Sequence, residues 1–330
     1  MVISRTPFRM SFFGGGTDYP AWYRKEGGSV LSATINKYCY ITCRHLPPFF
    51  DTKHRIVWSH IECANSPAEI LHPAIREALR AFELDPDDGL EIHHQGDLPA
   101  RSGIGSSSSF SVGMIHALLG YRGKMISKKE LALKAIDFEQ NVLKECVGCQ
   151  DQLAVSYGGI NRFNFFQNGD IQRHPVLMEE QKRSDLEKRL LLFYLGTNSL
   201  GSELAARLVA NMSAKTAVLR RMHEMVDEAN HILQNGKSLD CFGELLHEAW
   251  LLKQSLAEGI TTPAVQAAYE TARAHGAVGG KLMGAGGTGF MYFYVPPEKQ
   301  PSVREALGHL LHVPFTFERE GSTIIHYDRD

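Results

Sequence analysis

Short runs of β-branched and aromatic residues, bounded by Gly, Pro or Asp, fill the first third of the chain. Runs of this length and composition are typical of strands. They predict strands at 8–13, 30–35, 38–43, 55–59 and 90–93. Over 67–82 the apolar residues instead recur at helical spacing, which predicts one helix there. Two further helices are predicted over 107–119 and 128–144, the second starting at a capping box made by Ser127 and Glu130.

The second half of the chain changes to long helical periodicity between a few buried strands. The pattern predicts helices over 202–234, 239–257, 263–274 and 302–311. It predicts strands at 159–166, 171–174, 190–195, 290–295, 314–317 and 323–327. Because strands and helices do not alternate regularly, the α+β class is favoured over a doubly wound parallel sheet. The charged segment 179–188 predicts a boundary between two domains, 1–180 and 181–330.

Composition narrows the classes of function without choosing one. The 330 residues carry 35 Lys and Arg against 37 Asp and Glu, a formal net charge of -2, so bulk charge gives no argument for nucleic acid as a partner. No apolar run is long enough to span a membrane, and the first residues have no signal core. The sequence therefore predicts a cytoplasmic protein, and its six cysteines are expected to be thiols.

Glycine is the residue type whose placement is informative, because its thirty copies are clustered. One cluster lies in the segment 97–109, which reads Asp-Leu-Pro-Ala-Arg-Ser-Gly-Ile-Gly-Ser-Ser-Ser-Ser, follows a predicted strand and opens a predicted helix. A helix start offers unpaired N–H groups and a positive dipole end, and glycine lets a polyanion approach the backbone. The segment therefore predicts a phosphate loop, although it lacks the Gly-Lys-Ser/Thr ending of a Walker motif. The alternative is a serine-rich helix cap.

Three motifs in this order resemble those of the GHMP kinases, the superfamily of galactokinase, homoserine kinase, mevalonate kinase and phosphomevalonate kinase. The first is Pro-Phe-Arg-Met-Ser-Phe-Phe-Gly-Gly-Gly-Thr-Asp-Tyr at 7–19, and the second is Pro-x-x-x-Gly-Ile-Gly-Ser-Ser-Ser at 99–108. The third is Lys-Leu-Met-Gly-Ala-Gly-Gly-Thr-Gly-Phe at 281–290. The resemblance implies a ribosomal-protein-S5-like N-terminal half, a ferredoxin-like C-terminal half, and ATP and Mg²⁺ bound in the cleft between them.

The resemblance also assigns residues. Asp151, in Val-Gly-Cys-Gln-Asp-Gln, matches the proposed catalytic base of galactokinase, and Arg9 matches the arginine that pairs with it. Glu139 and Ser107 are the expected Mg²⁺ ligands, with Asp137 and Ser106 as the competing choices. The expected ATP-binding residues are Pro99, Arg101, Ser102, Gly103, Ile104, Gly105, Ser106, Ser107 and Ser108. The expected substrate-binding residues are Asp18, Thr17, Gly15, Gly16, Gly284 and Gly286.

Within the superfamily, the first motif is similar to that of the D-glycero-D-manno-heptose 7-phosphate kinases, which phosphorylate the anomeric hydroxyl. The Glu-His pair of galactokinase is replaced by Gly15-Gly16, which argues against galactose and leaves room for a larger sugar. A fucokinase-like or other monosaccharide 1-kinase is the first alternative. A non-catalytic sugar or nucleotide sensor on the same fold is the second, although Asp151, Glu139 and Arg9 are all present.

Other signals are weaker. A phosphorylated substrate needs an anion site, for which segment 196–202 is a candidate that could equally be an ordinary helix cap, and Arg24 and Lys25 are lesser ones. Lys281 has either a phosphate-binding or a structural role. A lone Cys146-x-x-Cys149 lacks the further ligands of a zinc site. The expected partner is a small sugar or sugar phosphate, and a homo-oligomer is compatible with the sequence.

Overall fold

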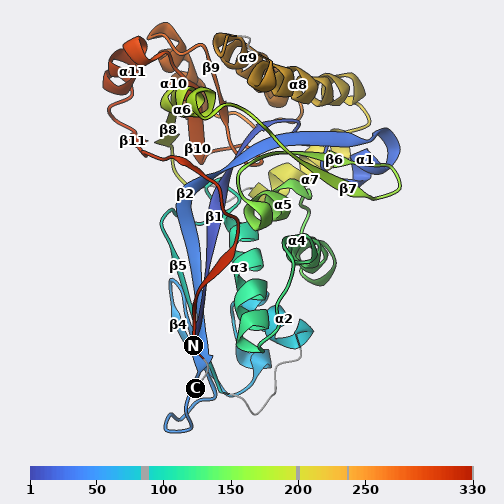
Figure 1. Ribbon diagram of the computed structural model, residues 1–330, viewed down its shortest axis with the longest axis vertical. Coiled ribbons are helices and arrows are strands. Elements are labelled where there is room, and N and C mark those ends of the chain that lie inside the picture. The colour runs from blue at the N-terminus through green and yellow to red at the C-terminus, as the bar shows by residue number, and fades with distance from the viewer. Residues whose placement is uncertain (83–88, 198–200, 236–237, 329–330) are drawn as a thin grey trace.

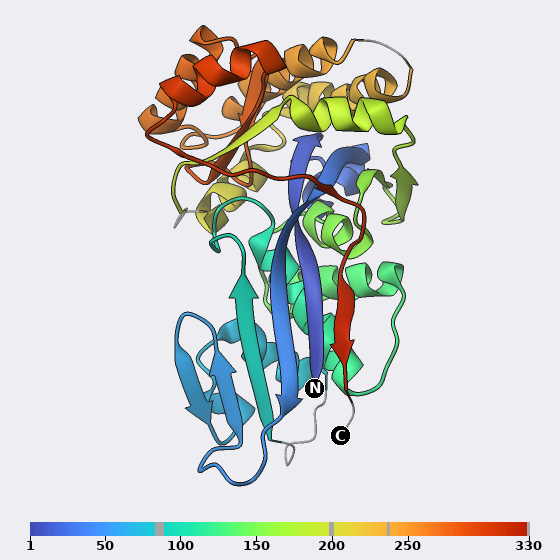
Figure 2. The ribbon, with the colours of Figure 1, turned by 60° about the vertical axis from the view of Figure 1, so that its left-hand side comes forward.

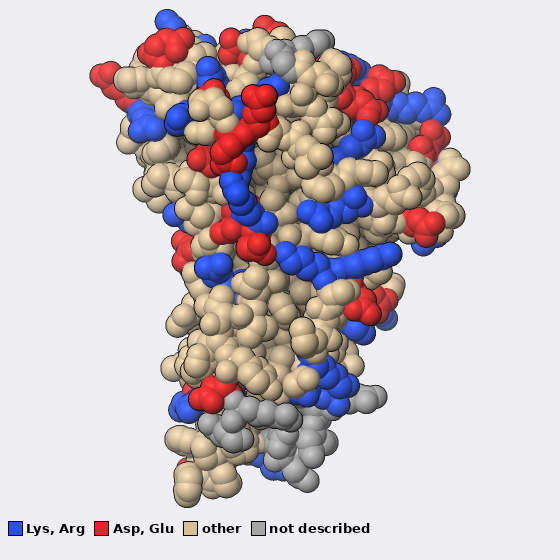
Figure 3. Space-filling model, viewed as in Figure 1, with Lys and Arg blue, Asp and Glu red and all other residues tan. Residues whose placement is uncertain are grey.

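The computed structural model describes residues 1–82, 89–197, 201–235 and 238–328. Figure 1 shows a long lower body, built around a twisted sheet and helix α3 (Ser106–Tyr121), below an upper part that is rich in helices. The mixture of helices and sheets confirms the α+β prediction. Lys and Arg alternate with Asp and Glu on the face shown in Figure 3, as the small net charge implies.

The centre of the large sheet is an antiparallel pair, β1 (Val2–Phe13) and β2 (Gly28–His45). The two strands predicted at 30–35 and 38–43 are one strand, so that prediction was wrong. The polar residue that separates them, Asn36, exchanges two hydrogen bonds with the backbone of Thr316, so it is satisfied without ending the strand. The sheet register shifts at this point, opposite Pro7 and Phe8.

Within the described residues, nine strands form this sheet. Besides β1 and β2 they are β3 (His54–Val57), β4 (Ile61–Ala64), β5 (Leu90–Gly96), β6 (Ile160–Phe165), β7 (Ile171–Pro175), β12 (Phe317–Glu318) and β13 (Thr323–Tyr327). The last two come from the C-terminal end of the chain: β13 pairs with β1 and β12 with β2. Figure 2 shows the C-terminal segment crossing from the upper part down to the edge of the large sheet. Strands from both sides of the predicted boundary at residue 180 therefore share one sheet.

The helices of the lower body lie beside the large sheet. They are α2 (Pro73–Ala81), α3, α4 (Lys128–Asp137) and α5 (Gln150–Tyr157), with short α1 (Pro20–Glu26) near the first motif. The predicted helix 67–82 is split into a 3₁₀ turn, Pro67–Glu69, and α2, because the residue before a proline avoids helical backbone and Pro73 follows His72. The Ser127–Glu130 capping box is confirmed. Helix α3 is buried on nearly all sides, so its start is held firmly at the top of the body.

The upper part contains a second, antiparallel sheet in the order β11–β8–β10–β9. Its strands are β8 (Leu190–Tyr194), β9 (Gly279–Leu282), β10 (Phe290–Tyr294) and β11 (Leu311–His312). The helices of this part are α6 (Glu180–Lys188), α7 (Gly201–Asn211), α8 (Thr216–Gln234), α9 (Asp240–Gln254), α10 (Pro263–Ala274) and α11 (Gln300–Ala306), together with a 3₁₀ turn at Pro297–Lys299. The charged boundary segment is thus helix α6, and the helix predicted over 202–234 is two helices separated by a turn.

An aromatic cluster joins the two parts at the upper end of β1. Phe12 makes edge-to-face contacts with Phe242 and Tyr292, at centroid distances of 5.4 and 5.9 Å, and Phe13 contacts Phe242 at 5.1 Å. Because side chains alternate along a strand, Arg9 and Ser11 share the other face from Phe12. The cluster therefore fixes one end of β1 and places these two polar residues at the junction. In the described part of the chain, no helix is long and apolar enough to cross a membrane.

Candidate active site

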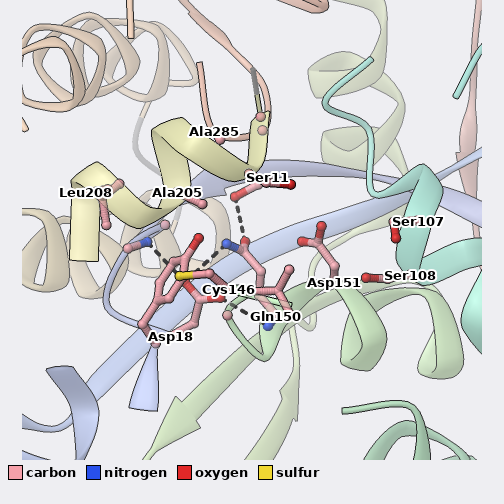
Figure 4. A pocket seen from close by; sticks show the side chains of 18 of the residues that line it. Ser11, Asp18, Ser107, Ser108, Cys146, Gln150, Asp151, Ala205, Leu208 and Ala285 are labelled. Atoms are coloured by element: carbon pink, nitrogen blue, oxygen red, sulfur yellow. Dashed lines mark hydrogen bonds between the residues drawn. The ribbon is translucent and has the colours of Figure 1, made fainter. Parts of the chain in front are cut away.

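A cavity of about 470 Å³ lies at the junction of the two parts, and all three glycine-rich motifs contribute to its wall. Figure 4 shows Ser107 and Ser108 at one end, Asp151 in the middle and Asp18 at the other end, with helix α7 above them. The residues that line it include Arg9, Ser11, Gly15, Gly16, Asp18, Tyr19, Arg101, Ser107, Ser108, Gln150, Asp151, Gln152, Lys253, Lys281, Gly284 and Ala285. Residues separated by more than 270 positions in the sequence thus face one space.

The first end of the cavity is the start of α3, where the predicted phosphate loop turns into the helix. Gly105 takes the left-handed conformation, with φ 71°, at the N-cap, and no side chain caps the helix. The first N–H groups of a helix have no partner within it, so they are available to an anion. Ser107 is exposed and Ser108 is buried, and both line the cavity together with Arg101. Ser106 instead accepts a hydrogen bond from the Arg101 backbone N–H at 3.1 Å.

The rest of this loop supports that end from beneath. Ser102 and Ile104 are fully buried, and exposed Pro99 accepts a hydrogen bond from the Ser102 hydroxyl at 2.6 Å. The third motif packs directly on the loop: a Cβ built on Gly284, whose φ is +70°, would lie 2.6 Å from Cα of Gly103. A side chain at Gly284 would therefore push the two motifs apart.

Arg9 and Asp151 form a two-pronged ion pair in the middle of the cavity. Arg9 Nε and Nη2 each donate to one carboxylate oxygen of Asp151 at 2.7 Å, and Nη1 donates to the Gly103 carbonyl at 2.6 Å. Arg9 is buried, whereas the Asp151 side chain keeps 23% of its surface exposed. The pair links the first motif, the phosphate loop and the first turn of α5. It leaves Asp151 accessible to a ligand while a planar cation contacts both of its carboxylate oxygens.

Asp18 lies at the far end, buried and held by a network of hydrogen bonds. Its carboxylate accepts from the backbone N–H of Gly16 at 3.0 Å, and from the backbone and side-chain nitrogens of Gln150, each at 3.2 Å. Gln150 in turn accepts from Ser11 at 2.8 Å. Burial, and to a lesser extent the charge of Asp151, raise the pKa of Asp18 to about 6. Asp18 is thus an oriented acceptor near Asp151, suited to a ligand hydroxyl.

Glu139 is fully buried behind the start of α3, in a π-helical turn, Phe138–Val142, that follows α4. One carboxylate oxygen accepts from Ser108 at 3.0 Å and from Gln152 at 2.5 Å, and the other has no partner. Burial, and then the charge of Glu145, raise the pKa of Glu139 to about 8, while the polar side chains of Ser111, Gln152 and Ser108 act to lower it. The competing carboxylate Asp137 is exposed and bonded to Asn141.

These residues fit a small divalent cation, which prefers carboxylate and hydroxyl oxygens. One carboxylate oxygen of Glu139 has no hydrogen-bond partner, its other oxygen accepts from Ser108, and Ser107 and Ser108 line the cavity in front of it. The described residues contain no cluster of three or more His, Cys, Asp or Glu side chains that would hold a metal by themselves. A cation at this place would therefore share its ligands with the phosphates of a nucleotide.

Some predicted site residues lie outside the cavity wall. Thr17 is fully buried, and its hydroxyl is occupied by the carbonyls of Gly14 and Ser29 at 2.8 and 2.9 Å, so it braces the first motif. Gly286 packs against Ile260. The candidate anion segment 196–202 includes 198–200, which lie outside the described residues, although Gly201 and Ser202 line the cavity.

Sequence reasoning missed Gln150, Gln152 and Lys253. Gln150 and Gln152 flank Asp151, and their positions in the first turn of α5 bring both to the cavity wall. Lys253 was recognisable, because it lies three and four residues after Trp250 and Ala249, on the apolar face of α9. A lysine on the buried face of an amphipathic helix is a signal for a partner or a ligand.

Comparison with known families gives two matches. The model of the GHMP kinases N terminal domain matches residues 69–159, and the model of the GHMP kinases C terminal matches residues 208–311. The first match contains the phosphate loop, Glu139 and Asp151. The second contains Lys253 and the third motif. The two matches therefore contain cavity-lining residues from both parts of the molecule, whereas the first motif, with Arg9 and Asp18, precedes both of them.

Similar proteins include the D-glycero-alpha-D-manno-heptose 7-phosphate kinase of Campylobacter jejuni, 27% identical, with 97% of each chain covered. A bifunctional fucokinase/GDP-fucose pyrophosphorylase of Arabidopsis thaliana is 26% identical over 91% of this chain and 30% of its own. Among solved structures, a D-glycero-D-manno-heptose 1-phosphate kinase from Bacteroides thetaiotaomicron superposes with a TM-score of 0.80 at 23% identity, covering 100% of both chains. A galactokinase from Lactococcus lactis complexed with galactose gives 0.72 at 18% identity, covering 98% of this chain and 94% of its own. The structural matches confirm the predicted two-part fold.

Proposed function

The chain belongs to the GHMP kinases and is a phosphotransferase, and on that premise we propose that it phosphorylates the anomeric hydroxyl of D-glycero-D-manno-heptose 7-phosphate, using ATP, to give the 1,7-bisphosphate. The observation that carries the catalytic part is the Arg9–Asp151 pair. It sets a partly exposed carboxylate between a helix start suited to phosphates and a buried carboxylate suited to sugar hydroxyls. Phosphoryl transfer depends mainly on this kind of positioning and on charge.

In the proposed reaction, the Asp151 carboxylate orients the acceptor hydroxyl and accepts its proton. The hydroxyl oxygen forms a bond to the terminal phosphorus of ATP, the bond from that phosphorus to the bridging oxygen breaks, and ADP leaves with the electron pair. Arg9 keeps Asp151 in place through both carboxylate oxygens and brings a positive charge to the reacting group. Asp18 and Gln150 hold the sugar through its other hydroxyls.

The nucleotide phosphates are proposed to lie on the start of α3, against the backbone N–H groups and Arg101. Ser107 and Glu139 would hold Mg²⁺, with Ser108 bonded to Glu139 beside them. When bound, the cation would neutralise charge on the phosphate oxygens. Because ATP is the donor, the proposed reaction belongs in the cytoplasm.

The proposed substrate rests on the relatives and on the first motif. The Campylobacter relative is named for the 7-phosphate of this heptose, and the Bacteroides structure for the 1-phosphate. At Gly15 the cavity wall has no side chain, and a Cβ there would meet only Gln150 and Ser11, at 3.6 and 3.7 Å. This leaves room for a sugar longer than a hexose.

An ADP-release assay with a panel of acceptors tests the proposal. The panel contains the heptose, its 7-phosphate, its 1-phosphate, L-fucose, D-mannose, D-galactose and mevalonate. The expected result is turnover with the 7-phosphate at a kcat/KM at least tenfold above every other acceptor, and a product whose anomeric carbon carries the new phosphate by ³¹P NMR. Turnover with only the 1-phosphate or only mevalonate would contradict it.

A fucokinase-like activity is the second candidate, supported by the relatives named for that activity. The same panel separates the two. If free L-fucose or D-mannose is the best acceptor, and a terminal phosphate does not raise kcat/KM, the substrate is an unphosphorylated sugar and not the heptose phosphate. Absence of turnover with every acceptor, despite nucleotide binding, would favour a sensor on this fold.

A further inference from the structure

Two lysines meet at the wall of the cavity, and the proposed reaction gives neither of them a role. Lys253 on α9 is 7% exposed, and its ammonium group donates to the carbonyls of Leu282 and Gly284 at 2.7 and 2.6 Å. Lys281 on β9 is 3% exposed and donates to the carbonyl of Phe12 at 2.8 Å. Both line the cavity. The bonds use two of the three donors of Lys253 and one of the three of Lys281.

Neither ammonium group has a carboxylate partner within 4.0 Å among the described residues. The third cation nearby, Arg9, is already paired with Asp151. A buried charge without a counter-ion is costly. Burial, and then the charge of Arg9, lower the pKa of Lys281 to about 7, with the charge of Asp18 opposing them. Burial, and then the charges of Lys281 and Arg9, lower the pKa of Lys253 well below its usual range.

A ligand in the cavity can supply the missing counter-charge and so favour the charged form of both lysines. Carbonyl dipoles solvate the two ammonium groups in part but supply no net charge. A phosphate monoester carries a charge of about -1.5 to -2 at neutral pH and three acceptor oxygens, which matches two ammonium groups that have donors to spare. A single carboxylate would compensate only one of them.

We propose that Lys253 and Lys281 form a second phosphate subsite, on the side of the cavity where the glycine-rich turn of the third motif meets β1. The subsite is separate from the start of α3, which binds the nucleotide phosphates. It rests on the proposed function only in assigning the cavity to phosphorylated ligands. The phosphoryl group that it binds is either that of the sugar phosphate or the group in transfer.

Equilibrium dialysis of radiolabelled inorganic phosphate against the full chain saturated with ADP tests the subsite directly. ADP occupies the start of α3, so the phosphate that binds reports on the remaining anion site. Lys253→Met and Lys281→Met keep the length of the side chain and remove its charge. The expected result is binding to the wild type and affinity at least tenfold lower in each variant. Equal affinity in the variants, or no saturable binding to the wild type, would overturn the proposal.

A matched control is Lys182→Met. Lys182 on α6 also donates from Nζ to a backbone carbonyl, that of Ile232 at 2.5 Å, but it lies outside the cavity wall. It should bind phosphate as the wild type does. If Lys253 and Lys281 had only a structural role, their variants would melt at a lower temperature but bind phosphate with the affinity of the Lys182→Met control. That result would overturn the proposed subsite.

Should either variant fail to fold, the wild type provides the second measurement. Crystals of the ADP complex soaked in tungstate, a phosphate analogue located by its anomalous signal, should show an anion in contact with both ammonium groups. Tungstate bound elsewhere in the cavity but not there would contradict the proposal.

Kinetics then identify the source of the phosphate. If the subsite binds the sugar phosphate, both lysine variants lose at least tenfold in the preference for the 7-phosphate over the free heptose. If it binds the group in transfer, they lose kcat by a similar factor, with KM for the sugar unchanged. If the lysine variants keep both the preference for the 7-phosphate and the wild-type kcat, the two lysines have no role in the reaction. Failure of every sugar to react would reject the proposed function while the dialysis result stands.

Discussion

On the proposed nucleotide side of the cavity, the backbone at the start of α3 and the glycine-rich turn at Gly284, which packs on Gly103, accompany the side chains of Arg101, Ser107 and Ser108. On the acceptor side the wall is side chains: Asp18, Gln150 and Ser11 in one hydrogen-bonded chain. Backbone recognises a phosphate whatever it is attached to, and it cannot be altered without moving the loop. Side chains can be exchanged one at a time, so we expect the acceptor side to determine which sugar is bound.

The largest effect is expected from Asp151→Asn, which removes the proposed proton acceptor between the two sides. The rate should fall by about 10²–10⁴-fold, the range typical of lost acid–base catalysis. Nucleotide affinity, measured by calorimetry, should stay within about threefold, because the start of α3 is untouched. Asp137→Asn, at an exposed carboxylate on the same side of the fold, is the control and should be unchanged. A wild-type rate in Asp151→Asn would remove Asp151 from the mechanism.

Gly284→Ala breaks the backbone side. The new Cβ would lie 2.6 Å from Cα of Gly103, and the φ of +70° disfavours any other residue, so the free energy of unfolding should fall by about 3 kcal/mol. The same variant should have a higher KM for ATP, whereas its KM for the sugar should change less. Urea denaturation and steady-state kinetics measure both. Full stability in this variant would show that the two motifs are not locked together.

Asp18→Asn tests the acceptor side through the pH dependence of stability. The pKa of Asp18 is near 6 in the folded chain and about 4 in the unfolded chain. Between pH 4 and pH 6 the folded chain therefore holds a proton on Asp18. The unfolded chain has lost that proton, so raising the pH through this window lowers the free energy of unfolding by about 3 kcal/mol. Asn cannot titrate. Urea denaturation at pH 4, 5, 6 and 7 should therefore show the difference between wild type and variant narrowing or reversing as pH rises, and a constant difference would contradict it.

The smallest effect on folding is expected from Gly15→Ala. Its backbone is outside the left-handed region and its Cβ would meet only ordinary contacts, so stability should change by no more than about 0.5 kcal/mol. The methyl group would enter the sugar space, so the KM for the sugar should rise several-fold with the KM for ATP constant. Gly16→Ala is the contrast, because φ is +103° there and the variant should be unstable. An unchanged sugar KM in Gly15→Ala would mean that the sugar does not reach this wall.

The sequence alone predicted those features of the two sides that depend on residues close together in the chain. The phosphate loop at a helix start, the Ser127 capping box and helix α10 over Pro263–Ala274 follow from motifs and spacing. The Arg9–Asp151 pair came from resemblance, because 142 residues separate its members. Contacts between segments that are distant in the sequence were not predictable. Thr17 lies buried against the backbone instead of facing the cavity, and β2 continues through Asn36 because Thr316 provides its hydrogen bonds.

The long strand β1 has a consequence for how the molecule is made. Its neighbour on one side, β2, follows within the next 32 residues, whereas its neighbour on the other side, β13, begins at Thr323. During synthesis one edge of β1 stays open until Thr323–Tyr327 has emerged, and an open edge invites pairing with other chains. Contacts this distant in sequence also slow folding. Folding during synthesis, more than the finished fold, should therefore benefit from chaperones that shield this edge until β13 has been made.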